Sequence, residues 1–132
     1  MRIRLLSIPV SDQDKALDFY VHKLGFILKK DISLGEARWL TLVSPEDPEG
    51  PELLLEPNAD YPAMKALKEA LLKDGIPMAA FAVDNVEQEF KRLKDKGVSF
   101  TLAPTDFGTA IIAIFDDTCG NLVQIYQEKA EK

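Results

Sequence analysis

One structural pattern occurs twice in this sequence. Residues 8–26 form the first copy and residues 81–98 the second. When Val10 is aligned with Val83, both copies continue as strand, helix cap, amphipathic helix, glycine and strand, and the first helix carries one extra residue. Two copies are too few, and their period is too long, for a solenoid. The repeat therefore predicts two similar modules that complete each other.

Each copy carries the signals of a capped helix. In the first, Ser11 followed by Asp14 resembles a capping box, and Gly25 is expected to end the helix. In the second, Asp84 or Asn85 can cap and a glycine closes the helix. The predicted buried stripes are Leu17, Tyr20, Val21 and Leu24 in the first helix, and Val86, Phe90 and Leu93 in the second.

Strand-like runs follow each helix. They cover residues 26–32, 37–43 and 52–56 in the first half, and 98–102, 109–115 and 122–126 in the second. Segments 44–51 and 117–121 are rich in turn residues and predict hairpin loops.

A third amphipathic segment, residues 62–73, lies between the halves and ends at Gly75. Leu67, Ala70 and Leu71 give it an apolar face, so we interpret it as a linker helix. The predicted organisation is one domain over 1–132. Its first module covers about 1–58, the linker helix about 61–75 and the second module about 76–128.

Charge and composition exclude several classes of partner. The chain has 46% hydrophobic residues, a formal net charge of −6 and a pI near 4.8. It has no Lys/Arg-rich block, so binding to nucleic acid or to an anionic membrane surface is disfavoured. No apolar stretch is long enough to span a bilayer. The single cysteine, Cys119, suits a reducing compartment, and the cytoplasm is the predicted location.

A βαβββ unit used twice resembles the vicinal-oxygen-chelate superfamily, which includes glyoxalase I, bleomycin-resistance proteins and extradiol dioxygenases. The resemblance is carried by residues 8–12, 16–20, 24–26 and 115–124. The last segment is similar to the family's Asp-Pro-Asp-Gly-Asn turn, with Thr118 and Cys119 in place of Pro and Asp. It implies an α+β fold in which two βαβββ modules form a curved mixed sheet around a cleft, and a homodimer.

The resemblance also implies where a metal would bind in this family. The ligand positions are occupied here by Leu5, Met78, Gln124 and, in the best register, Leu54, with Glu52 or Glu56 if that strand shifts by two residues. A transition metal needs several imidazole, carboxylate or thiolate donors at one point. The only histidine, His22, falls on the first helix. We therefore expect neither a metal nor another cofactor.

Strand alternation predicts which side chains share a face with these positions. The candidate ligand-binding residues are Ser7, Trp39, Thr41, Glu52, Leu54, Glu56, Met78, Gln124 and Tyr126. An apolar cleft with carboxylates and aromatic rings favours a small, partly apolar, cationic ligand. Each residue also has a plain structural interpretation, with carboxylates in water and Met78 or the aromatic rings in the core or an interface.

Three functions are compatible with this set. The leading hypothesis is a metal-independent small-molecule-binding protein of the glyoxalase/bleomycin-resistance type, which sequesters its ligand. The alternative is an enzyme of the superfamily (lyase, isomerase or dioxygenase-like) that uses Glu52 or Glu56 as a general base or in a rearranged metal site. The third, a protein-interaction module, has no binding motif to support it.

Overall fold

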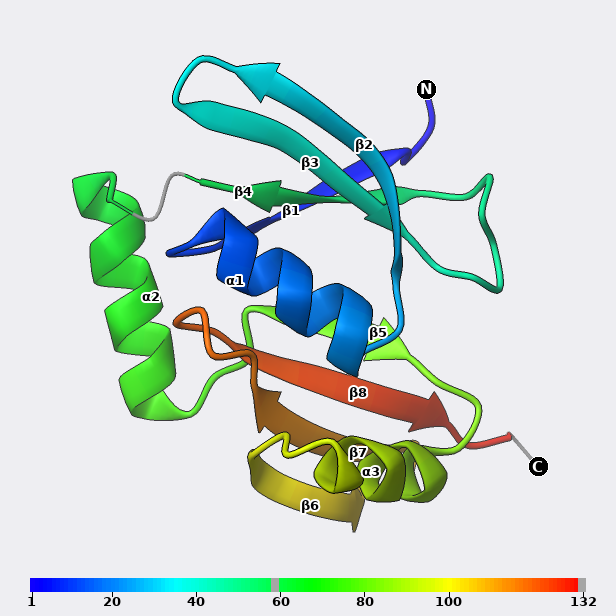
Figure 1. The fold of residues 1–132 in the computed structure, drawn as a ribbon. Helices are drawn as coiled ribbons and strands as arrows, with labels where there is room; N and C mark the ends of the chain where they lie inside the picture. Colours follow the sequence, from blue (N-terminus) through cyan, green and yellow to red (C-terminus); the bar gives the residue numbers. More distant parts are fainter. Residues whose placement is uncertain (58–59, 131–132) are drawn as a thin grey trace. The chain divides into compact units, whose positions relative to one another are not determined.

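Two four-stranded sheets, one in each half of the chain, organise the fold (Figure 1). The structure is a computed structural model that describes residues 1–57 and 60–130. These residues divide into two compact units, Met1–Lys68 and Glu69–Lys132. The predicted end of the first module, near residue 58, lies outside the described residues.

The first unit has the predicted succession of strand, helix and three strands. Its elements are β1 (Leu5–Pro9), α1 (Gln13–Asp18), the π-helical segment η1 (Phe19–Lys23), β2 (Ile27–Leu34), β3 (Ala37–Val43) and β4 (Glu52–Glu56). The strands lie in the order β1-β4-β3-β2, with β1 parallel to β4 and the other neighbours antiparallel. The bounds of β3 and β4 are those predicted, because a turn-rich segment separates the two strands.

The second unit repeats this topology. Its elements are β5 (Ala79–Ala82), α3 (Val86–Asp95), β6 (Phe100–Asp106), β7 (Ala110–Asp116) and β8 (Leu122–Glu128). The strands lie in the order β5-β8-β7-β6, and β5 is parallel to β8. Helix α2 (Pro62–Asp74) contains the boundary between the two units. The internal repeat predicted from the sequence is thus present as two four-stranded βαβββ arrangements.

The helix caps follow the repeat with one correction. Asp12, rather than Ser11, caps α1, and its carboxylate accepts from the amide of Lys15 at 3.1 Å. Asp12 has extended backbone and directly precedes the helix, so its side chain is the one that reaches the third helical amide. In the second unit Asn85 caps α3 by accepting from the amide of Gln88 at 3.0 Å.

The extra residue of the first helix is accommodated by η1. There the amide of Leu24 donates to the carbonyl of Phe19, five residues earlier, at 3.1 Å. A bond of this span widens one turn of the helix and so takes up one more residue than an α-helical turn. Gly25 then ends the helix with a φ of 92°, in the left-handed conformation predicted for it.

Each sheet buries one face under the helix of its own unit. In the first unit, the side chains on this face with no more than 1% exposure come from α1, from η1 and from three strands, and include Ala16, Tyr20, Ile8, Leu40, Leu42 and Leu55. In the second unit Val86 and Leu93 of α3 are buried with Phe115, Val123 and Ile125. Phe90 of α3 packs edge-on against Phe100 at a centroid distance of 4.7 Å. Each fully buried Val, Leu, Ile or Phe side chain of this set contributes about 1.5–3 kcal/mol.

The linker helix α2 buries only part of the face predicted for it. Leu71 is half-buried, but Leu67 is 45% exposed and Ala70 is exposed, whereas Lys68 is only 6% exposed. The ammonium group of Lys68 donates to the carbonyl of Pro9, the last residue of β1, at 3.0 Å. A lysine can bury its aliphatic stem and still place its charge on a carbonyl, so Lys68 also contributes to the buried side of α2.

Candidate functional site

One face of the first sheet gathers the predicted ligand-binding residues of the first module. Thr41 lies opposite Leu54 in the antiparallel pair of β3 and β4, and Ser7 lies beside Leu54 in the parallel pair of β1 and β4. Because side chains alternate along a strand, residues two positions away share the same face. This face, here called the first open face, carries Leu5, Ser7, Lys30, Trp39, Thr41, Glu52, Leu54 and Glu56.

The first open face is the one turned away from α1, and Thr41 and Leu54 on it are themselves buried, with 0% and 4% exposure. The residues of α1 and the sheet that are buried together belong to the alternate positions, such as Leu40 and Leu55. In Figure 1, α1 lies along one side of the first sheet. Trp39 and Thr41, whose face the sequence left unresolved, are therefore on the same face as Glu52.

A polar cluster of Thr41, Glu52 and Lys30 occupies part of this face. The hydroxyl Oγ1 of Thr41 donates to Oε1 of Glu52 at 2.6 Å, and Nζ of Lys30 lies 3.5 Å from Oε2. The hydrogen bond from Thr41, helped by the charge of Lys30, lowers the pKa of Glu52 although desolvation opposes the shift. Glu52 is therefore a carboxylate at neutral pH. A general base tuned for that pH needs the opposite shift.

The strand that presents Trp39 is held by Gln13, at the start of α1. Its Nε2 donates to the carbonyls of Arg38 at 2.7 Å and of Leu55 at 3.0 Å, and the amide of Arg38 donates to its Oε1 at 3.1 Å. Strands β3 and β4 pair with each other at two positions, Thr41 with Leu54 and Leu42 with Leu53. The Gln13 amide thus bridges the two strands beyond their paired segment.

The side chain of Arg38 ties the β2–β3 hairpin to α1. Its guanidinium group donates to both carboxylate oxygens of Asp31 at 3.1 Å and also pairs with Asp14. The hydrogen bonds that Arg38 donates to Asp31, and then to Asp14, raise the pKa of Arg38, and Arg38 lowers the pKa of Asp31. The two-oxygen contact with Asp31 joins the two strands of the hairpin, and the pair with Asp14 connects the hairpin to α1.

The second sheet has a corresponding open face. Gln124 lies beside Ala80 on β5 and opposite Ile114 on β7, and Tyr126 lies beside Ala82. Met78 continues this face before β5, because its amide donates to the carbonyl of Leu122 at 2.8 Å and extends the parallel ladder. Gln124 and Tyr126 are half-buried, and the alternate residues Val123 and Ile125 belong to the core under α3. The three predicted residues of the second module therefore share one face.

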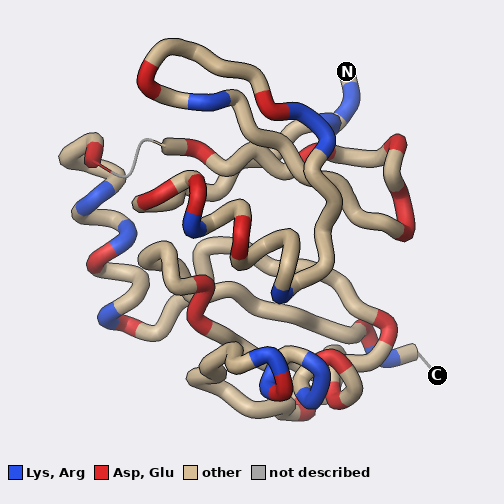
Figure 2. The backbone as a smooth tube through the Cα atoms, in the orientation of Figure 1, with Lys and Arg blue, Asp and Glu red and all other residues tan. Residues whose placement is uncertain are grey.

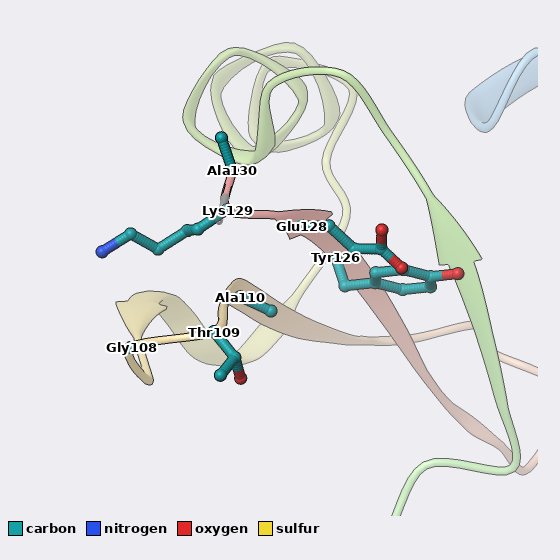
Figure 3. A pocket seen from close by; sticks show the side chains of 7 residues that line it. All are labelled: Gly108, Thr109, Ala110, Tyr126, Glu128, Lys129 and Ala130. Atoms are coloured by element: carbon teal, nitrogen blue, oxygen red, sulfur yellow. The ribbon is translucent and has the colours of Figure 1, made fainter. Parts of the chain in front are cut away.

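A groove of about 1060 Å³ lies in the second unit, where β7 begins and β8 ends (Figure 3). It is lined by Gly108, Thr109, Ala110, Tyr126, Glu128, Lys129 and Ala130. Figure 3 shows Tyr126 and Glu128 extending to the same side of β8, whereas Lys129 extends to the other side. Tyr126 is the one predicted site residue in this groove.

Sequence reasoning missed three residues that shape these faces: Lys30, Gln13 and Glu128. Lys30 was not placed because a bulge follows Leu28 in β2 and changes which residues face Thr41. Glu128 was missed because β8 was predicted to end at Tyr126, two residues early. Alternation from Tyr126 would have found it.

The donor set does not fit a metal of the kind that the fold family uses. Leu5, Met78 and Gln124 offer no imidazole, carboxylate or thiolate. No group of three His, Cys, Asp or Glu side chains able to hold a metal ion occurs within residues 1–57 and 60–130. His22, the only histidine, is exposed on the helix, with 73% of its side-chain surface accessible.

Figure 2 marks the charged residues along the backbone, where they are frequent on the helices and in the loops. In the part of the chain that the structure describes, no helix is both long and apolar enough to cross a membrane.

Comparisons with known proteins agree with this architecture. An uncharacterized protein of Bacillus subtilis (strain 168), YurT, is 53% identical over 97% of this chain and 100% of its own length. The crystal structure of UcmS2 is 32% identical with a TM-score of 0.82, covering 97% of this chain and 98% of that one. The crystal structure of TnmS3, an antibiotic binding protein from Streptomyces sp. CB03234, is 28% identical with a TM-score of 0.75, covering 98% and 97%.

The family itself is identified by a match over nearly the whole chain. The sequence model of the Glyoxalase/Bleomycin resistance protein/Dioxygenase superfamily matches residues 2–125. This span covers the first unit and reaches into β8, the last strand of the second, and the topology of both units is that of the glyoxalase-like fold. This chain is therefore a member of the Glyoxalase/Bleomycin resistance protein/Dioxygenase superfamily.

Proposed function

We propose that this protein binds and sequesters a small, partly apolar organic molecule without using a metal. The observation that carries the proposal is the first open face, where Trp39, Thr41 and Glu52 lie together. On the same face Leu5 and Leu54 stand where the family's metal ligands are expected. A mostly apolar surface with a few fixed polar groups is the usual composition of a small-molecule site.

The similarity to an antibiotic binding protein supports a ligand of natural-product size and chemistry. We assign ligand contacts on the first open face to Ser7, Trp39, Thr41, Glu52, Leu54 and Glu56, and on the face of the second sheet to Met78, Gln124 and Tyr126. Aromatic rings beside carboxylates, on a chain of net charge −6, favour a ligand that carries a positive charge.

The enzymatic alternative is less well supported. A general base works best when its pKa is near the working pH, and the Thr41 hydrogen bond moves the pKa of Glu52 away from it. Binding, by contrast, uses a fixed carboxylate directly.

We also propose that the protein acts in the cytoplasm as a homodimer. The single cysteine, Cys119, is buried and is compatible with a reducing compartment. Leu5 and Leu6 on the edge strand β1 are 41% and 59% exposed. Apolar side chains on a sheet edge are typical of surfaces that a partner covers.

The test is a thermal-unfolding screen of the purified protein in EDTA against aromatic natural-product antibiotics, some cationic and some neutral. A ligand present at a hundred times its Kd stabilises the native state by about 2.7 kcal/mol, which raises the Tm by several degrees. Mass spectrometry of the recovered compound checks that it is unchanged. Chemical conversion of the compound would favour the enzyme instead.

A variant locates the site. Trp39→Leu removes the aromatic surface of the first open face and should weaken the ligand at least fivefold. Tyr61→Leu removes an exposed aromatic ring outside this face and serves as the control. Equal affinity in Trp39→Leu and the wild type would show that the ligand binds elsewhere.

A further inference from the structure

The groove at the end of β8 has the components of a cation site. Tyr126 and Glu128 are two residues apart on one strand, so both side chains leave the same face of the sheet. Opposite Glu128 in the β7–β8 pair lies Ala110, whose methyl group leaves space in front of the carboxylate. Figure 3 shows the carboxylate of Glu128 on the same side as the ring of Tyr126.

The rim of this groove is held in place by Asp106. Its Oδ1 accepts from the amide of Gly108 at 2.8 Å, and its Oδ2 pairs with Nζ of Lys129 at 2.8 Å. The amide of Lys129 donates to the carbonyl of Thr109 at 3.0 Å. These bonds fix the turn between β6 and β7 against the end of β8, so the groove is formed before any ligand arrives.

The charges around the groove favour a cation over an anion. The one ammonium group that lines it, on Lys129, is offset by Asp106, and these interactions lower the pKa of Asp106. No ion pair joins Glu128 to another of the described residues. Glu128 therefore leaves a net negative charge beside an aromatic ring.

We propose that this groove binds a small organic cation, an ammonium group on an apolar body, placed over the ring of Tyr126 and beside the carboxylate of Glu128. A ring face attracts a cation through its quadrupole, and a carboxylate adds a second, directional contact. The inference deepens the proposed function, and rests on it, because Tyr126 belongs to the ligand-binding set. It adds a residue, Glu128, and a ligand charge that can be tested without the natural ligand.

The experiment is an amide NMR titration of the ¹⁵N-labelled full chain with choline, and with its neutral isostere 3,3-dimethylbutan-1-ol. The two probes have the same shape and differ in charge. We expect choline to shift the amides of Gly108, Thr109 and Ala110 with a millimolar Kd, as is usual for one exposed aromatic and one carboxylate contact. The alcohol should bind at least threefold more weakly. Equal binding of the two probes, or choline shifts that fall outside the groove, would overturn the inference.

Four variants separate the two contacts. Glu128→Gln keeps the size of the side chain and removes the charge, and should weaken choline about threefold to tenfold. Glu87→Gln makes the same charge change on exposed α3 and should leave binding as in the wild type. Tyr126→Phe keeps the ring and should retain choline, whereas Tyr126→Leu should lose it. Equal weakening by Glu128→Gln and Glu87→Gln would mean that net charge alone attracts the probe, and would contradict the inference.

Failure of this inference and failure of the proposed function are distinguishable. If the antibiotic screen finds a ligand while choline leaves the groove amides unshifted, the proposed cation site is contradicted and the proposed binding function is still supported. If choline binds in the groove while no compound in the screen stabilises the protein, the cation site is supported and the proposed ligand class is contradicted.

Discussion

The side-chain amide of Gln13 hydrogen-bonds to both the N–H and the C=O of Arg38, which lies 25 residues away. It contacts the backbone of β3 as a neighbouring strand would, and it reaches β4 at the same time through the carbonyl of Leu55. A glutamine at the start of a helix thus takes part in the sheet. These bonds hold the backbone of β3 directly before Trp39, whose side chain belongs to the first open face.

Replacing Gln13 should destabilise the first unit. Gln13→Leu is close in size but removes three hydrogen bonds and leaves half-buried backbone groups of Arg38 and Leu55 without this partner. We expect the free energy of unfolding to fall by about 2–4 kcal/mol, measured by urea denaturation. Gln88→Leu, exposed on α3, should change it by less than about 0.5 kcal/mol. Similar small losses in both variants would show that Gln13 is not a bridge.

The caps of the two repeated helices give a second prediction. Asp12→Ala and Asn85→Ala each remove the side-chain acceptor of a helix N-terminus, and each should cost about 1 kcal/mol in unfolding free energy. Ser11→Ala should cost much less, because Ser11 does not cap α1. A loss from Ser11→Ala equal to that from Asp12→Ala would restore the capping box that the sequence suggested.

Local patterns in the sequence were enough to predict the order of helices and strands along both units. The strand bounds at β3 and β4 follow from turn residues that sit between apolar runs, and the glycine ends of both helices follow from their need for positive φ. The sequence left the face of Trp39 and Thr41 unresolved; once the structure pairs Thr41 with Leu54, alternation assigns the other side chains of both strands to a face.

Contacts between distant segments were not recoverable in the same way. The bonds of Gln13 to Arg38 depend on how α1 lies across the sheet, and no spacing rule in the sequence encodes that placement. The burial of Lys68 on α2, whose ammonium group donates to the carbonyl of Pro9, was not indicated by the apolar stripe of that helix. The only sign of the π-helical turn in the sequence is that the first helix has one residue more than the second. That difference in length does not indicate which hydrogen bonds change.

The hydrogen bond between Thr41 and Glu52 predicts a pH dependence. The pKa of Glu52 in the folded protein lies below its ordinary value of 4.5, so this contact stabilises the protein above that value. The stabilisation is lost as the pH falls through the folded pKa. Glu52 binds a proton more readily in the unfolded chain than in the folded protein, so protonation favours unfolding. Acid unfolding should therefore be part-driven by Glu52.

Thr41→Val tests this directly. Valine has nearly the shape of threonine but cannot donate, so the pKa of Glu52 should rise toward its ordinary value in a ¹³C carboxyl NMR titration. Thr101→Val, at an exposed position of β6, should leave that pKa as in the wild type. If the pKa of Glu52 stays low in Thr41→Val, then Lys30 rather than the hydrogen bond is its main cause.

The last prediction concerns metals. Given the family relationship, metal binding distinguishes most clearly between a binding protein and an enzyme. Leu5 and Leu54 replace side chains that could ligate, and Gln124 and Met78 supply only weak or soft donors, so the chain should bind no transition metal at one equivalent per chain. Elemental analysis of the purified protein, and thermal unfolding with added Zn²⁺, Mn²⁺, Fe²⁺, Ni²⁺ and Co²⁺, should show neither stoichiometric metal nor a rise in Tm.

One equivalent of metal, lost in Glu52→Gln or Glu56→Gln, would instead assign ligands to β4 and make an enzyme with a rearranged metal site the better interpretation.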